Sequence, residues 1–238
     1  MVSVSGIKEI AAGTNHSVML TEGGNILSAG SSTRSQMGDG SSTDRTTAVY
    51  TKNTSNKYVS DAKHISAGEN SVFISRKKDS EGNPQGMYVI GRNDYGQLFT
   101  GNTTRAYYAT EVEKEKDILT MALTEGQTGL MVDAEGNVYT VGYNGQGQLG
   151  NGTTENTNTF QQVKLNENGD YLENIVSIAA GYTASYAVTA EGEVYGWGRN
   201  DDGELGIGSK SSEINELYPV KMKKVSKIIQ IAAGANHA

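Results

Sequence analysis

Short apolar segments recur along the chain at nearly even intervals, and each leads through a turn into a second short apolar segment. Segments of four or five residues bounded by Gly, Asn and Glu predict β-hairpins, because a helix shows a longer run with a 3.6-residue period. The first segments of these hairpins are SVML (17–20), SVFIS (71–75), GLMV (129–132) and SYAVT (185–189). Their partners are ILSAG (26–30), MYVIG (87–91), VYTVG (138–142) and VYGWG (194–198).

Two glycine-containing boxes frame the hairpins. The first box precedes the hairpin and occurs as IAAG (10–13), ISAG (65–68), LTEG (123–126), IAAG (178–181) and IAAG (231–234). The second box follows the hairpin and fits G-x-N-x-x-G-Q-L-G-x-G at 142–152, 91–101, 198–208 and, most loosely, 30–40. A later segment, such as QQVKL (161–165) or PVKM (219–222), brings each unit to about four strand signals.

A period of 50 to 60 residues with four strands per unit predicts an all-β protein, a β-propeller of four-stranded blades. The small residues of the first box belong on the innermost strand, where blades converge. Leu98, Leu149 and Leu205 of the second box would fill the blade cores. The repeats are expected at approximately 7–62, 63–119, 120–175 and 176–228, with a partial fifth at 229–238.

The second box also contains a match to a dinucleotide-binding fingerprint, G-x-G-x-x-G, at Gly145, Gly147 and Gly150. That motif functions only between a buried strand and a helix whose N-terminus faces the pyrophosphate. The following segment, NGTTENTNTF (151–160), is polar and has no helical period. The glycines are therefore interpreted as turn residues that permit positive φ, and no cofactor is expected.

The two boxes, recurring in the same order from about Ile7 to His237, resemble the repeats of the RCC1 (regulator of chromosome condensation 1) family. The stretches 179–208 and 11–30 carry the resemblance best. It implies a β-propeller, usually of seven blades, that acts mostly through protein contacts. Because about four repeats are present, we expect an arc of a seven-bladed ring and a longer parent chain. An open arc would expose apolar blade faces, which favours self-association.

Composition narrows the classes of partner. The net charge of −7 argues against nucleic acid, and the lysines of KMKKVSK (221–227) would be scattered over both faces of a strand. The absence of cysteine excludes disulfides and thiolate metal sites. No signal peptide or membrane-spanning run is visible, so a cytoplasmic and a secreted protein both remain open and no membrane partner is expected. The Asn-, Thr- and Tyr-rich style suggests a bacterial source.

Residues that could carry chemistry are few. His16 and His237 occupy equivalent repeat positions, which indicates packing rather than a catalytic or metal-binding pair, and His64 stands apart. The stretch NDDGELGIGS (200–209) lacks the acidic spacing of a calcium loop. No metal site and no catalytic residue are predicted, and the protein is not expected to be an enzyme.

The rim loops are the stronger candidates, because loops from successive blades of a propeller collect on one face. Two loop sets vary while their flanks repeat, one after the first box and one inside the second. The candidate binding residues are Asn15, Asn70, Asp94, Tyr95, Gln127, Tyr143, Tyr182, Asp201 and Asp202. Solvated turns would also account for them. Glu125 stands where the first box of other repeats has Ala, so it is either a polar anchor in the channel or a sign of repeat decay.

Three functions follow from these features. The favoured one is a non-enzymatic scaffold whose rim binds a protein partner. A second is a guanine-nucleotide exchange factor or regulator of a small GTPase, in which the insertion at 75–87 would act as the protruding element that such factors use. The same insertion is also explained as tolerated variation in loop length. A third is a glycan-active enzyme with carboxylates in the propeller channel.

Overall fold

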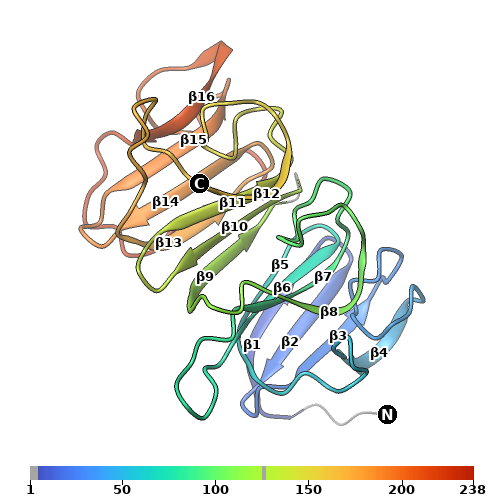
Figure 1. Ribbon diagram of the computed structural model, residues 1–238. Coiled ribbons are helices and arrows are strands. Elements are labelled where there is room, and N and C mark those ends of the chain that lie inside the picture. The colour runs from blue at the N-terminus through green and yellow to red at the C-terminus, as the bar shows by residue number, and fades with distance from the viewer. Residues whose placement is uncertain (1–4, 125–126) are drawn as a thin grey trace.

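Four antiparallel sheets of four strands each follow one another along the chain (Figure 1). The computed structural model describes residues 5–124 and 127–238, and this part of the chain contains strands and loops but no helix. The first blade consists of β1 (Ile7–Ala12), β2 (His16–Thr21), β3 (Ile26–Gly30) and β4 (Arg45–Tyr50). The second consists of β5 (Ala62–Ala67), β6 (Ser71–Arg76), β7 (Met87–Gly91) and β8 (Ala106–Val112).

The third and fourth blades repeat this plan. The third consists of β9 (Ile118–Leu123), β10 (Thr128–Asp133), β11 (Val138–Gly142) and β12 (Thr157–Gln162). The fourth consists of β13 (Ile175–Ala180), β14 (Ala184–Thr189), β15 (Val194–Asn200) and β16 (Ser211–Lys221). In each sheet the spatial order equals the chain order, and every pair of neighbours is antiparallel. The prediction of four-stranded propeller blades is confirmed.

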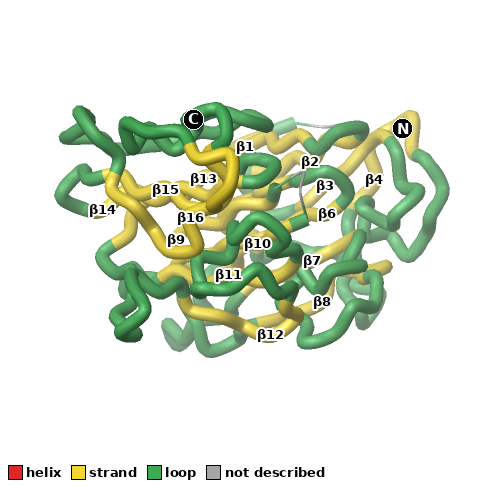
Figure 2. Tube along the Cα trace, turned by 90° about the horizontal axis from the view of Figure 1, so that it is seen from above, coloured by secondary structure: helices red, strands yellow, loops and turns green. Residues whose placement is uncertain are grey.

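The blades lie side by side in an arc, with β4 at one end and β14 and β15 toward the other in the view from above (Figure 2). The first strand of each blade contacts the first strand of the next, so β1, β5, β9 and β13 form the inner edge. Small residues are required there. A Cβ on Gly13 would lie 2.3 Å from the carbonyl oxygen of Gly68, and one on Gly68 would lie 2.8 Å from Cβ of Leu123.

The apolar core is divided into layers between neighbouring blades. Val18, Leu20 and Ile26 of the first blade pack against Ile65 and Ile74 of the second. Equivalent layers lie between the second and third blades and between the third and fourth. The three leucines of the second box, Leu98, Leu149 and Leu205, are completely buried, as predicted.

The register of β9 corrects the alignment of the first box in the third repeat. Leu123 pairs with Gly129, which is the position that Ala12, Ala67 and Ala180 hold in the other inner strands. The box of this repeat is therefore MALT (121–124) rather than LTEG (123–126). The prediction failed because the first two strands of this blade are separated by one more residue of sequence than in the other blades. Glu125, the candidate channel residue, lies outside the described residues.

The two ends of the arc differ. Ile10 of the first blade is 68% exposed, whereas its equivalents Ile65, Met121 and Ile178 are 7–8% exposed under a neighbouring blade. At the other end, residues 229–238 lie against the fourth blade. The Gly234 amide donates to the carbonyl of His237 at 2.9 Å, which repeats the turn between Gly13 and His16.

Candidate functional site

Two sets of loops meet at one end of every blade. Because the strands are antiparallel, the connection from the first strand to the second and the one from the third to the fourth lie at the same end. We call this end the glycine-box rim: it comprises the short loop after each first strand and the second glycine box. One backbone hydrogen bond joins the two loops in each blade: Ser31 N to Asn15 O, Arg92 N to Asn70 O, Tyr143 N to Gln127 O, and Arg199 N to Thr183 O.

The first glycine of each second box makes this contact possible. Gly142 has φ +109°, and a Cβ there would lie 2.4 Å from the Gln127 carbonyl oxygen. Gly198 has φ +102° and the same relation to Thr183, with a separation of 2.4 Å. An L side chain rarely adopts this backbone conformation, and here it would also collide with the neighbouring loop. The glycines thus hold the two loops together.

A buried asparagine shapes each of the three well-matched boxes. Asn144 is fully buried; its Oδ1 accepts a hydrogen bond from Leu149 N at 2.9 Å, and its Nδ2 donates to the carbonyls of Thr153 and Glu155 at 3.0 and 3.1 Å. Asn93 and Asn200 play the same part in their boxes. This amide ties the two ends of the loop and fixes the residues between them.

The acidic candidates form two ion-pair clusters on the rim. Arg92 contacts Asp94 at 2.7 Å and Glu69 at 3.2 Å. Arg199 contacts Asp201 at 2.6 Å and Asp202 at 3.9 Å, and its hydrogen bond to Asp201 raises the pKa of the guanidinium. Each arginine is thus matched by two carboxylates. Asp94, Asp201 and Asp202 were selected from the sequence as candidates; Glu69 belongs to one of the variable loops but was not selected, and the two arginines were not predicted.

Four of the candidate residues converge on one hollow of about 280 Å³. Tyr95 comes from the second blade, Gln127 and Tyr143 from the third, and Tyr182 from the fourth. The rings of Tyr95 and Tyr143 meet edge to face, with centroids 5.3 Å apart and an interplanar angle of 71°. Gln146 and Thr183 complete the lining. We call this site the tyrosine hollow.

The remaining candidates lie around or away from this hollow. Asn70 borders a small pocket that also contacts Gln127, and its Oδ1 accepts a hydrogen bond from Gln36 at 3.2 Å. Asn15 lies in the first blade, outside the hollow. Gln146 and Thr183 belong to the two variable loop sets seen in the sequence, but they were not selected as binding candidates.

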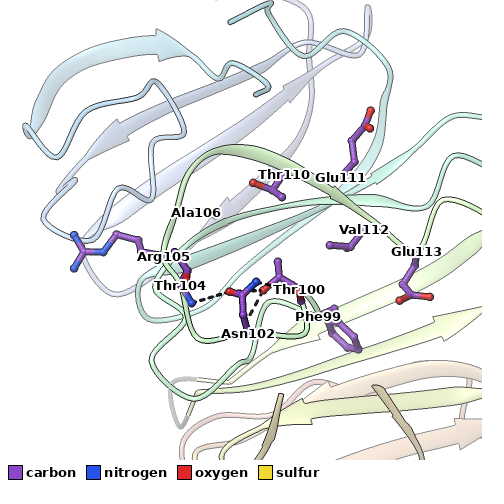
Figure 3. Close-up of a pocket in the computed structure, with 10 residues that line it drawn as sticks. All are labelled: Phe99, Thr100, Asn102, Thr104, Arg105, Ala106, Thr110, Glu111, Val112 and Glu113. Atoms are coloured by element: carbon purple, nitrogen blue, oxygen red, sulfur yellow. Dashed lines mark hydrogen bonds between the residues drawn. The ribbon is translucent and has the colours of Figure 1, made fainter. Parts of the chain in front are cut away.

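A second hollow, of about 350 Å³, lies on the outer side of the second blade (Figure 3). Its lining includes Phe99, Arg105, Glu111 and Glu113, and the two carboxylates point in different directions (Figure 3). Glu111 is paired with Arg76 at 3.0 Å, and burial raises the pKa of Glu113. This arrangement does not set two carboxylates on either side of one substrate bond.

The histidines are separated in space and environment. His16 is 4% exposed, and this burial lowers its pKa to about 4. His64 contacts Glu9 at 3.2 Å on the surface, and His237 is exposed near the C-terminus. Among the described residues, no group of three or more His, Cys, Asp or Glu side chains could hold a metal ion. The same part of the chain has no helix with the length and apolarity of a membrane span.

Comparisons with known proteins agree with this geometry. Two family profiles, both described as the Regulator of chromosome condensation (RCC1) repeat, match residues 135–188 and 191–238, and residues 7–36 and 175–204. The human X-linked retinitis pigmentosa GTPase regulator is 32% identical over 151 residues, which is 63% of this chain and 14% of that protein. The Arabidopsis thaliana ultraviolet-B receptor UVR8 is 25% identical over 97% of this chain and 50% of its own length. The chain thus spans half or less of these relatives.

Solved structures share the fold. Human WBSCR16 superposes with a TM-score of 0.78 at 19% identity, covering 99% of this chain and 58% of that one. Prp20p from Saccharomyces cerevisiae superposes with a TM-score of 0.74 at 18% identity, covering 94% and 52%. The latter structure was described together with the binding of Prp20p to Gsp1p and histones. At these identities the likeness concerns the fold alone.

Proposed function

This chain belongs to the RCC1-repeat family, and from that premise we propose that it is a non-enzymatic protein-binding propeller whose glycine-box rim forms a composite surface for a protein partner. The observation that carries this proposal is the convergence of variable residues from three blades on the tyrosine hollow, within a frame that otherwise repeats. Tyrosine suits a contact surface because its ring buries apolar area while its hydroxyl can still hydrogen-bond.

The chemistry of the rim supports binding rather than catalysis. Asp94, Asp201 and Glu69 are held in ion pairs by arginines of the same rim. A general acid needs a carboxyl whose pKa is raised and whose proton can be delivered to a substrate. The rim is better suited to hydrogen bonds and ion pairs with a partner surface.

The test compares two variants that each lose two tyrosine rings. Tyr95→Ala with Tyr182→Ala removes rings from the hollow, whereas Tyr58→Ala with Tyr171→Ala removes rings from the opposite rim. The immobilised parent chain and the two variants are used to capture proteins from the source organism, and the captured proteins are quantified by mass spectrometry. We expect the Tyr58/Tyr171 variant to capture the same proteins as the parent, and the Tyr95/Tyr182 variant to lose them. Equal capture by both variants would place the interface elsewhere.

Regulation of a small GTPase is the second candidate function, favoured by the human relative named as a GTPase regulator. The inserted segment between β6 and β7 lies on the opposite rim, so an exchange activity that uses it would leave the tyrosine hollow free. Release of a fluorescent GDP analogue from a small GTPase of the same organism separates the two functions. Acceleration that survives the hollow variant but is lost when residues 78–84 are shortened would favour regulation through the insertion.

A further inference from the structure

We propose that the tyrosine hollow binds one cationic side chain, an arginine, from an extended basic segment of the partner protein. The inference rests on the proposed function, since it names the chemistry that the rim recognises. Three features of the hollow carry it: the aromatic walls, an acceptor on a lining residue that has no partner in the described part of the chain, and the charge of the surroundings.

The walls of the hollow present aromatic rings from three successive blades. Tyr95 and Tyr143 meet edge to face, and Tyr182, 52% exposed, contributes the third ring. A guanidinium is attracted to the electron-rich face of an aromatic ring and stacks flat on it. The Tyr143 ring is folded over its own loop. Its hydroxyl oxygen lies 2.2 Å from the position that a Cβ on Gly145 would take. The equivalents of Gly145 in the other second boxes are Thr33, Asp94 and Asp201, so this ring placement is particular to the third blade.

Gln127 supplies an acceptor that has no hydrogen-bond partner among the described residues. Its Oε1 is shielded from solvent and accepts no hydrogen bond within residues 5–124 and 127–238. The residue is also held at φ +66°, an uncommon conformation for a side chain of this size. A buried acceptor without a donor is unfavourable, and a guanidinium brings five N–H donors. An incoming arginine would therefore satisfy Oε1 once the Gln127 side chain turns this atom toward the hollow, while the guanidinium plane stacks on the rings.

The charge around the hollow selects for a cation. Arg92 of the second blade and Arg199 of the fourth are each bound by two carboxylates, so both clusters carry excess negative charge. Asp94 also borders a neighbouring depression together with Tyr95. The chain as a whole has a net charge of −7, which would draw a basic segment toward this surface.

The experiment is an NMR titration of the chain with 13C-labelled tyrosine rings, using the peptide acetyl-Gly-Ser-Arg-Ser-Gly-amide. Its two counterparts carry citrulline, which is neutral and nearly isosteric, or lysine in place of arginine. We expect saturable chemical-shift changes confined to Tyr95, Tyr143 and Tyr182. The citrulline peptide should bind at least about tenfold more weakly than the arginine peptide, and the lysine peptide should bind with an affinity between the two. Equal affinity for arginine and citrulline overturns the proposal. So does the absence of saturable change up to about 10 mM, where even a millimolar complex would be largely formed.

Two variants separate recognition from mere structural support. Gly145→Ala displaces the Tyr143 ring without requiring a strained backbone, and it should lower the affinity for the arginine peptide by about tenfold. Gln127→Glu adds a negative charge at this acceptor. It should raise the affinity for the arginine peptide severalfold and leave the affinity for the citrulline peptide unchanged. Tyr171→Ala on the opposite rim is the matched control and should bind as the parent does.

Failure of this inference can be told apart from failure of the proposed function. If the peptide does not bind but the hollow variant still loses a captured protein, the rim binds a partner through other chemistry. If the arginine peptide binds and capture is insensitive to the hollow variant, the hollow is a cation site and the proposed interface is wrong.

Discussion

At the scale of single residues, His16 has the most distinctive environment. It begins β2, is almost fully buried, and neither ring nitrogen has a hydrogen-bond partner in the part of the chain that the structure describes. Burial disfavours the charged imidazolium, which lowers the pKa of His16 from 6.5 to about 4. The unfolded chain therefore binds a proton that the folded chain rejects at intermediate pH.

This difference predicts a loss of stability in mild acid. The contribution of His16 is fully present above about pH 6.5 and is lost as the pH falls toward 4, to a total of roughly 3 kcal/mol. Urea unfolding at pH 7.5 and pH 4.5 measures this loss. In His16→Leu, the difference in the free energy of unfolding between the two pH values should become smaller. His237→Asn, which removes an exposed histidine near the C-terminus, is the control and should keep the parental difference. An unchanged pH dependence in His16→Leu would show that carboxylates alone are responsible.

At the scale of elements, the second glycine box is the unit that positions the rim. Replacing Asn144 by Ala would leave Leu149 N and the carbonyls of Thr153 and Glu155 without their partner. Because unsatisfied buried groups cost about 1–3 kcal/mol each and are not additive, we expect a loss of about 3 kcal/mol in the free energy of unfolding, measured in urea. Asn168→Ala, in an exposed turn, should stay within about 0.5 kcal/mol of the parent. A similar loss in both variants would contradict this role of the amide.

The boxes also explain how much of the molecule was predictable. Recurrence fixed the strands, the innermost position of the first box and the burial of Leu149, because each follows from one repeating geometry. The first box of the third repeat was placed two residues too late in the sequence, because only strand pairing reveals the extra residue before Thr128. Phe99 departs from the pattern as well: it has φ +58° where Gly150 has +63°, and its buried ring packs edge to face against Phe73. The tyrosine hollow was not predictable as a cavity, because it depends on how three blades are placed relative to one another.

At the scale of the whole molecule, the exposed inner edge of the first blade is the dominant feature. Ile10 is 68% exposed where equivalent residues are covered by a neighbouring blade, and Ile229 is 87% exposed near the other end of the arc. Apolar surface of this kind favours association, since each contact removes it from water. A seven-bladed ring, in which further blades would cover both ends, stays a prediction.

The 238-residue chain is accordingly expected to self-associate through the ends of its arc. Light scattering after size exclusion should give a mass above the 25.3 kDa of one chain, rising with protein concentration. Ile10→Lys places a charge on the exposed edge and should return the mass to that of a monomer. Leu119→Lys alters an exposed apolar residue of the inner strand of the third blade, away from the ends, and should leave association intact. A monomer at every concentration would mean that the outer blades are stable without cover, because the inter-blade layers already bury enough apolar surface to hold the arc together.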